Sequence, residues 1–270
     1  MSKIHTACVD LRDEGSYARE RPAGAVRLEL DDILQRAYLL PPRCRPLVIV
    51  GGSTTAVRPV LEALRLAGRQ VVRHYPDETW REHLAVETGR PSRTRLWEAA
   101  AAVEHAVQRY KARLPGPQAL DIACGTGRNA VYLALGGLEV TGVDVLADAL
   151  ERARDLATRH GACIRTLQRD LEKSGALHGL GADIIVVVRY LERSLFAALE
   201  DALTPGGILV YETFTEKQAA AFGHPRNRRR LLAPGELLRS FPHLDVLESD
   251  EGFHDGAHVA RLIARRPESA

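Results

Sequence analysis

The sequence is poor in cysteine and in long apolar runs, and each shortage excludes a class of protein. The four cysteines are widely spaced and form no Cys-x-x-Cys pair, which argues against a disulfide framework and against a metal site. A reducing, cytoplasmic location is therefore expected. Even the longer uninterrupted apolar runs, such as Ile184–Val188, are only a few residues long, so we expect no membrane span. Charges interrupt residues 1–13, and no signal peptide is expected there.

The sequence also lacks an excess of charge of one sign. It has 37 Lys+Arg against 35 Asp+Glu, a net charge of +2. Division at residue 92 leaves 14 basic and 12 acidic residues before it, and 23 of each after it. Neither part has the cationic excess that binding to phosphate backbones requires, so neither nucleic acid nor a membrane is an expected partner. With 45% hydrophobic residues, the chain is typical of one large or two modest globular domains.

Two stretches of alternating strand and helix signals are separated by a polar segment. In the first stretch, residues 1–75, we expect strands at Thr6–Leu11, Ala25–Leu30, Leu47–Val50 and Gln70–Tyr75, and helices at Asp31–Tyr38 and before Gly68. Residues 76–92 contain two prolines and Gly89 and are expected to form a linker.

Residues 93–270 predict a long Ala-rich helix at Thr94–Leu114, followed by a regular alternation of strands and helices. The expected strands are Ala119–Ile122, Glu139–Val143, Cys163–Thr166, Asp183–Val188, Ile208–Thr213, Leu244–Glu251 and His258–Ala264, and the expected helices between them are Arg128–Leu135, Ala147–His160 and Arg193–Leu203. Such alternation indicates a mostly parallel sheet with helices on both faces. An Asp255-Gly256 turn predicts a closing hairpin, so the last strand is expected to be antiparallel.

The most informative stretch is the glycine loop after the strand Ala119–Ile122. Gly125 and Gly127 allow the backbone to approach a ligand closely just before a helix begins. Taken alone, Gly125-x-Gly127-x-x-Ala130 also fits an NAD(P)-binding fingerprint, and Asp144 at the end of the next strand fits ribose binding in either case. An NAD(P)-dependent oxidoreductase therefore remains an alternative.

Two acidic residues favour a different cofactor. Asp121 would repel a pyrophosphate but suits the ammonium of a sulfonium amino acid, and Asp170 is placed to accept from an adenine amino group. With the glycines and Asp144, they resemble the cofactor site of class I S-adenosylmethionine-dependent methyltransferases, over roughly residues 93–270. The resemblance implies a Rossmann-like domain that binds S-adenosyl-L-methionine. The implied cofactor residues are Asp121, Ala123, Gly125, Gly127, Asn129, Asp144, Asp170 and Arg189; Ala123 replaces the family's usual first glycine.

The methyl acceptor is expected at the ends of the fourth and fifth strands of this domain. Arg189, Tyr190, Tyr211 and Glu212 are the candidate pocket residues there, and no catalytic residue or metal is assigned. The segments that follow resemble small-molecule methyltransferases of the tellurite-resistance type, which implies a thiol, a metalloid oxyanion or another small nucleophile as acceptor. A non-catalytic sensor of the cofactor is a second alternative. Arg228–Arg230 is expected to be a solvated loop.

Residues 1–75 resemble a rhodanese domain. The resemblance rests on Val9–Glu14 with Tyr17, on Arg21–Ala25, and on the strand Leu47–Val50. Active rhodaneses place a cysteine directly after that strand, whereas this chain has Gly51, which has no thiolate to carry sulfur. We therefore expect a small, inactive rhodanese-like α/β domain, to which a protein partner or a second copy in a homodimer can dock.

Overall fold

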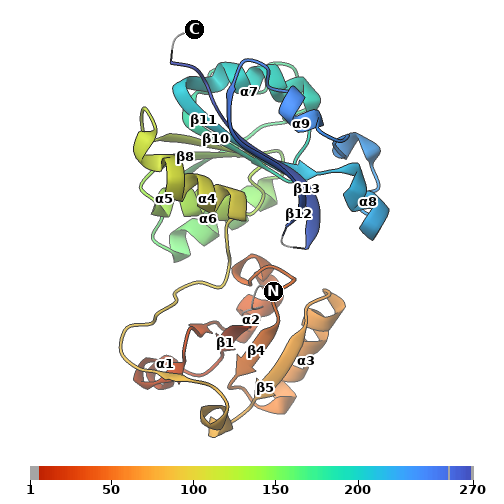
Figure 1. Cartoon of the computed structure of the whole chain (residues 1–270). Coiled ribbons are helices and arrows are strands. Elements are labelled where there is room, and N and C mark those ends of the chain that lie inside the picture. Colours follow the sequence, from red (N-terminus) through yellow and green to blue (C-terminus); the bar gives the residue numbers. More distant parts are fainter. Residues whose placement is uncertain (1–5, 255, 269–270) are drawn as a thin grey trace. The chain divides into compact units, whose positions relative to one another are not determined.

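The computed structural model describes residues 6–254 and 256–268. The chain divides into two compact units, Met1–Glu98 and Ala99–Ala270. Each unit has its own β-sheet (Figure 1) and its own hydrophobic core.

The first unit is built on a sheet of four parallel strands in the order β3-β1-β4-β5. The strands are β1 (Ala7–Asp10), β3 (Val26–Arg27), β4 (Leu47–Val50) and β5 (Val71–Tyr75). Helices α1 (Glu14–Arg19), α2 (Leu30–Gln35) and α3 (Thr54–Leu66) accompany it, with a short 3-10 helix at Ala37–Leu39. The prediction of Leu47–Val50 as a buried strand is confirmed, whereas the strand expected at Ala25–Leu30 is only two residues long.

Residues 76–92 are not the plain linker that their polar composition predicts. They form a 3-10 helix at Glu78–Glu82 and the strand β6 (Val86–Glu87), which pairs with β2 (Arg21–Pro22). The side chain of Trp80 is fully buried in a core cluster of the first unit. This segment therefore belongs to the first unit, because its Trp80 packs into the core of that unit.

A carboxylate fastens the end of this segment. Glu87 accepts hydrogen bonds from Arg21 Nε at 3.1 Å, from the Gly24 N–H at 3.1 Å and from the Ser92 N–H at 2.7 Å, and it also accepts from the Ser92 hydroxyl. Arg21 is 1% exposed and also donates to the carbonyls of Tyr17 and Gly89. These bonds lower the pKa of Glu87 to about 2.

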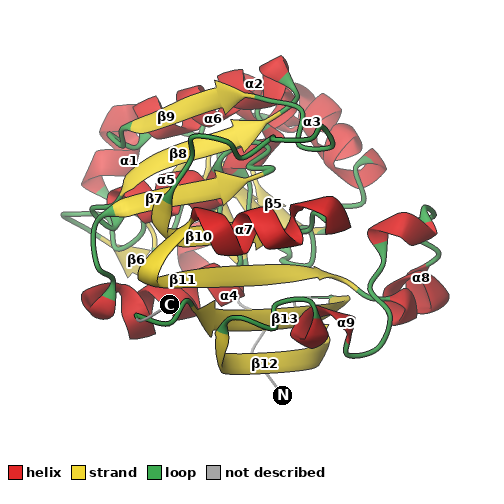
Figure 2. Ribbon diagram, turned by 90° about the horizontal axis from the view of Figure 1, so that it is seen from above, coloured by secondary structure: helices red, strands yellow, loops and turns green. Residues whose placement is uncertain are grey.

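The second unit contains a mixed sheet of seven strands in the order β12-β13-β11-β10-β7-β8-β9 (Figure 2). The strands are β7 (Gln118–Ile122), β8 (Glu139–Asp144), β9 (Ile164–Gln168), β10 (Ala182–Val188), β11 (Leu203–Phe214), β12 (Asp245–His254) and β13 (Ala257–Arg265). The strands from β11 to β9 are parallel, and β13 is antiparallel to both β11 and β12, which confirms the predicted hairpin. Of the predicted Asp255-Gly256 turn, Asp255 lies outside the described residues.

Helices cover both faces of this sheet, as the alternation of elements predicts. They are α4 (Ala101–Tyr110), α5 (Arg128–Leu135), α6 (Ala147–Arg159), α7 (Phe196–Ala202), α8 (Glu216–Phe222) and α9 (Glu236–Arg239). Residues of α4 and α5 share one core cluster with Val186 and Val210, and residues of α7 and α9 share the other with Ile185 and Tyr211. Adjacent strand residues thus face opposite cores.

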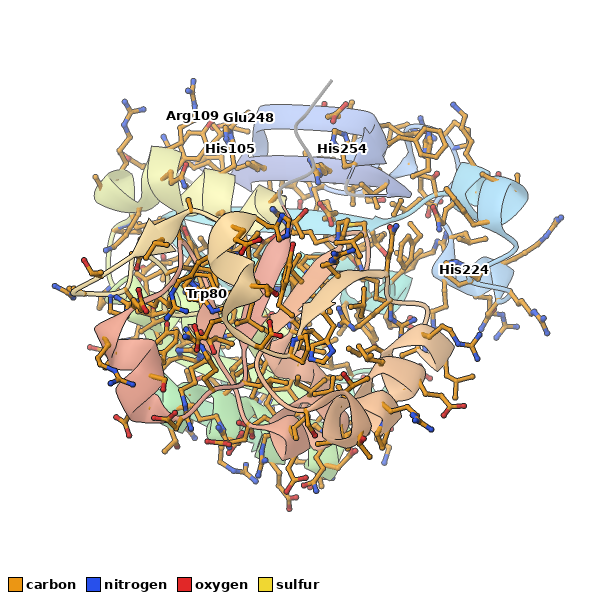
Figure 3. All side chains as sticks on the ribbon, turned by 90° about the horizontal axis from the view of Figure 1, so that it is seen from below. Trp80, His105, Arg109, His224, Glu248 and His254 are labelled. Carbon is orange, nitrogen blue, oxygen red and sulfur yellow. The ribbon has the colours of Figure 1, made fainter. Side chains whose placement is uncertain are left out.

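The long helix predicted at Thr94–Leu114 is wrong at its beginning. Helix α4 starts at Ala101, and the Ala100 N–H before it donates to Asn129 Oδ1 at 2.9 Å. His105, Arg109 and Tyr110 all contact the Glu248 carboxylate of β12. Figure 3 shows His105 and Arg109 close to Glu248. Within the described residues, the structure contains no helix that is both long and apolar enough to span a bilayer.

The Glu87 contacts predict a pH-dependent stability of the first unit. We expect Glu87→Gln to lower the free energy of unfolding by about 2 kcal/mol at pH 7, because charged hydrogen bonds to Arg21 and Ser92 are lost. Since the folded-state pKa of Glu87 is depressed to about 2, the difference is present at neutral pH and disappears as the pH falls towards that value.

Denaturant unfolding followed by tryptophan fluorescence measures this difference. Glu82→Gln is the control, because Glu82 is an exposed carboxylate in the same segment. Equal stability of the two variants would contradict a fastening role for Glu87.

Candidate functional site

The candidate site lies at the carboxyl ends of the parallel strands of the second unit. Strands β7 and β10 are neighbours there, with Ile122 opposite Val187. Within the described residues, Ala123 and Arg189 are the non-glycine residues with positive φ, at 55° and 57°, and each lies directly beyond one of these strand ends. Such backbone conformations are unfavourable for residues with a side chain and concentrate at binding sites. The topology also favours a ligand here, because the chain order reverses between β7 and β10.

The glycine loop follows β7 and is open on one side and tightly packed on the other. A Cβ added to Gly125, whose φ is 54°, would meet no atom within 4 Å. At Gly127, with a φ of 77°, an added Cβ would lie 2.6 Å from the Ala153 Cβ of α6. Gly127 therefore lets α5 begin close against α6, while Gly125 leaves its backbone accessible to a ligand.

Asp144 closes β8 and holds this loop. Its Oδ2 accepts from the Gly125 N–H at 2.8 Å, and its Oδ1 accepts from the Leu146 N–H at 3.0 Å. A carboxylate oxygen has two acceptor sites, so each oxygen keeps one for a hydroxyl. The side chain is fixed in place and still has the capacity to bind a diol.

Asp121 is enclosed near the end of β7. It is 1% exposed, and its Oδ2 accepts from the Ala130 N–H at 2.9 Å. Burial raises its pKa to about 7, the Ala130 bond opposes that rise, and Asp144 adds to it. An enclosed carboxyl of this kind supports the junction between β7 and α5, and the ammonium contact expected for it remains a prediction.

The other expected cofactor residues vary in accessibility. Asp170 lies beyond β9, is partly exposed, and caps the Glu172 N–H at 3.0 Å. The amide oxygen of Asn129 accepts from the Ala100 N–H, so it supports the beginning of α4. The sequence reasoning overlooked Val145 and Leu146, which are 49% and 58% exposed beside Asp144. The sequence pattern that could have pointed to them is a pair of apolar residues directly after Asp144, the acidic residue that ends the strand.

The candidate acceptor residues do not form one pocket. Tyr211 is 1% exposed, packs against Phe196 and Phe241, and its hydroxyl donates to the Tyr190 carbonyl at 3.1 Å. Glu212 points to the opposite face, where it forms a 2.6 Å ion pair with Arg261. The predicted shared pocket is wrong for these two residues, because successive strand residues face opposite sides of the sheet.

Arg189 and Tyr190 remain available at the strand end. Arg189 is exposed, and its guanidinium lies 5.7 Å from the Phe214 ring centroid. Tyr190 is half-buried under Arg230, and burial raises the pKa of its phenol. A phenol with a raised pKa stays protonated at neutral pH and can donate a hydrogen bond.

The arginine run Arg228–Arg230 is only in part the solvated loop that the sequence predicts, because Arg228 and Arg229 are exposed whereas Arg230 is partly buried. It forms a 3-10 helix, and Arg230 donates to the Leu191 carbonyl at 3.2 Å and pairs with Glu172. Arg193 holds the same turn through the carbonyls of Arg229 and Leu231, at 2.8 and 2.9 Å. These bonds attach the run to the loops that follow β9 and β10.

In the first unit, Gly51 follows β4 and has a φ of 82°. An added Cβ would lie 2.7 Å from Arg12 Cγ and 3.0 Å from the Arg12 backbone nitrogen. Arg12 is itself held by Asp10, with Nη2–Oδ2 at 2.7 Å, while His74 Nε2 lies 3.0 Å from the Gly51 carbonyl oxygen. The loop therefore has no room for a side chain at position 51.

Comparison with known proteins identifies the region around the glycine loop. Residues 119–207 match the family model described as a methyltransferase domain. This stretch of the chain is a methyltransferase domain.

Curated relatives of the chain are ubiquinone biosynthesis O-methyltransferases. The protein of Cronobacter sakazakii is 31% identical over 103 residues, which are 36% of this chain and 42% of that protein. The protein of Actinobacillus pleuropneumoniae serotype 5b is 29% identical over 116 residues, 40% of this chain and 50% of that protein. The chain thus spans about half the length of the curated relatives it matches.

Solved structures show the same fold. TehB from Haemophilus influenzae aligns with a TM-score of 0.50 and 22% identity, over 60% of this chain and 62% of that one. An S-adenosylmethionine-dependent methyltransferase from Clostridium acetobutylicum aligns with a TM-score of 0.51 and 13% identity, over 61% and 90% of the two chains. These likenesses support the Rossmann-like fold of the methyltransferase domain.

The buried Asp121 predicts an unusual pH dependence. Because its folded-state pKa is raised to about 7, the folded state holds the proton more tightly than the unfolded chain. The contribution of Asp121 to stability therefore falls as the pH rises from about 4 to about 7. We expect Asp121→Asn to remove this dependence, so that the Tm of the variant minus that of the wild type increases between pH 5 and pH 8. A constant difference in thermal unfolding would contradict the raised pKa.

The crowding at Gly51 predicts that a thiol cannot be restored by one substitution. We expect both Gly51→Ala and Gly51→Cys to lower the free energy of unfolding by about 1–3 kcal/mol, because each adds a Cβ at positive φ against Arg12. Gly24→Ala is the control, since Gly24 also has positive φ but its added Cβ would meet no atom within 4 Å. Sulfur transfer from thiosulfate by Gly51→Cys would contradict this account.

Proposed function

We propose that the chain transfers a methyl group from S-adenosyl-L-methionine to a small-molecule acceptor. The observation that carries the proposal is Asp144, whose carboxylate is fixed by two backbone N–H groups beside the open Gly125 and the exposed Val145 and Leu146. A negatively charged acceptor for a ribose diol next to an apolar surface for a purine suits a nucleoside. The methyltransferase domain covers the same residues.

The residues present fit this cofactor. In the proposed arrangement, Asp144 accepts from the ribose hydroxyls, Val145 and Leu146 cover the adenine, and Asp170 accepts from the adenine amino group. The open backbone at Gly125 leaves room for the amino-acid end of the cofactor. The cofactor supplies an activated methyl group, so the protein contributes mainly by positioning the acceptor.

The acceptor in this proposal lies beside Arg189 and Tyr190. Arg189 supplies an exposed positive charge and Tyr190 a phenol that remains protonated, so the two suit a small anion or a thiol. A thiol acceptor needs no base beyond its own ionisation, and the buried Tyr211 and the ion-paired Glu212 are poorly placed to provide one.

For the first unit, we propose a rhodanese-like module that does not transfer sulfur. The closed loop at Gly51 supports this assignment, because the nucleophilic thiolate has neither a side chain nor space there. A role in docking a partner fits a unit without its own catalytic group.

Isothermal titration calorimetry with S-adenosylhomocysteine tests the proposed function. We expect the wild type to bind it and Asp144→Ala to weaken binding at least ~10-fold, or by ~1.4 kcal/mol, because the ribose loses a charged acceptor. Asp148→Ala is the control, since Asp148 is exposed on α6 and its carboxylate forms an ion pair with Arg152 of the same helix. Absence of binding, or equal binding by Asp144→Ala, would overturn the cofactor assignment.

Two further measurements separate the alternatives. Tight binding of NADH in place of S-adenosylhomocysteine would support an oxidoreductase. Methylation of any acceptor in a panel of thiols, metalloid oxyanions and phenols would exclude a non-catalytic sensor.

A further inference from the structure

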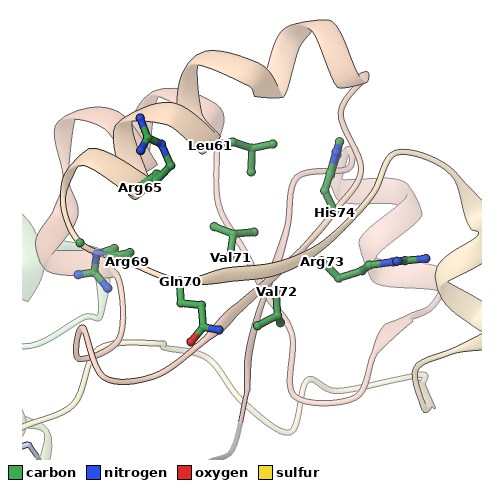
Figure 4. A pocket seen from close by; sticks show the side chains of 9 residues that line it. Leu61, Arg65, Arg69, Gln70, Val71, Val72, Arg73 and His74 are labelled. Atoms are coloured by element: carbon green, nitrogen blue, oxygen red, sulfur yellow. The ribbon is translucent and has the colours of Figure 1, made fainter.

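A groove follows the outer edge of the sheet in the first unit. β5 is the last strand in the order β3-β1-β4-β5, so within the described residues one side of its backbone has no strand beside it. The groove has a volume of about 720 Å³ and lies between α3 and β5 (Figure 4). An unpaired edge of this kind is a template for another extended chain.

The groove combines an apolar floor with exposed edges. Leu61 of α3 and Val71 of β5 lie opposite each other across it (Figure 4). Val72 also lines the groove and is 47% exposed. A chain that lay along β5 would cover this apolar surface.

The charge of the groove is of one sign. Its ionisable lining residues are Arg65, Arg69, Arg73 and His74, and no carboxylate is among them. Within the described part of the chain, none of the three arginines has an ion pair. Arg73 lies over the Tyr75 ring at 5.5 Å, and Arg69, 9% exposed, donates to the Pro41 carbonyl at 2.8 Å. The guanidinium charges are therefore not neutralised by this unit.

This charge decides between possible occupants. A second copy of the chain would bring the same arginines against these, and like charges across paired strands are destabilising. An acidic chain gains both the backbone hydrogen bonds of the edge and the compensation of two exposed cations, Arg65 and Arg73.

We propose that β5 binds an extended, acidic segment of a partner protein by strand addition. The segment pairs its backbone with the free edge of β5, places apolar side chains over Leu61 and Val71, and directs carboxylates to Arg65 and Arg73. The backbone bonds supply affinity, and the arginines select for acidic sequences.

The test uses the full-length chain and a fluorescent, end-capped peptide of alternating glutamate and valine, about six residues long. Fluorescence anisotropy is expected to show saturable binding below about 1 mM, and a lysine–valine peptide of equal length is expected not to bind. The same acidic peptide with alternate backbone nitrogens methylated is also expected not to bind, because it lacks the donors for strand pairing.

A charge reversal identifies the surface. The double variant Arg65→Glu, Arg73→Glu is expected to bind the glutamate peptide about tenfold more weakly or worse and to bind the lysine peptide. Arg58→Glu is the matched control, because Arg58 is exposed on the same helix but does not line the groove. Far-UV circular dichroism and the fluorescence of Trp80, which is buried in the first unit, verify that each variant is folded.

The proposal is overturned by any of three results: no binding of the glutamate peptide, equal binding of the glutamate and lysine peptides, or equal binding of the methylated peptide. None of these results depends on methyl transfer, so failure here and failure of the proposed function are distinguishable.

Discussion

The candidate site depends on the hydrogen bonds that the Asp144 carboxylate accepts from two backbone N–H groups. It joins the end of β8 to the glycine loop through Gly125 and to the beginning of the next segment through Leu146. The loop must also leave β7 with positive φ at Ala123 and let α5 begin against Ala153. One anion therefore orders the backbone that a nucleoside approaches, and the neighbouring Asp121 is shifted towards its neutral form partly because that anion is present.

The two units use buried charge in different ways. In the second unit, Asp121 is enclosed with one backbone partner, so its ionised form is unfavourable. In the first unit, Glu87 has several donors, including Arg21, and its ionised form is favoured. The difference lies in burial and in the number of donors, since Asp121 is fully enclosed with one donor, whereas Glu87 is only partly buried and receives several.

The sequence predicts the elements whose determinants are local. The strand Leu47–Val50, the glycine loop and the closing hairpin depend on neighbouring residues, and they are present in the structure. The segment at 76–92 depends on Arg21, more than sixty residues away, and its polar composition carries no sign of that partner. The shared pocket of Tyr211 and Glu212 was a different error, because the alternation of strand residues was sufficient to separate them.

The packing around Gly51 has a consequence for the history of the first unit. A Cβ at position 51 would overlap with the side chain of Arg12, and Arg12 is held by the fully buried Asp10. A lineage that carries this arginine conformation reaches a nucleophile at position 51 only through coordinated replacements at several sites, the first of which is harmful alone. A single substitution at this position is therefore not expected to give a sulfur-carrying residue.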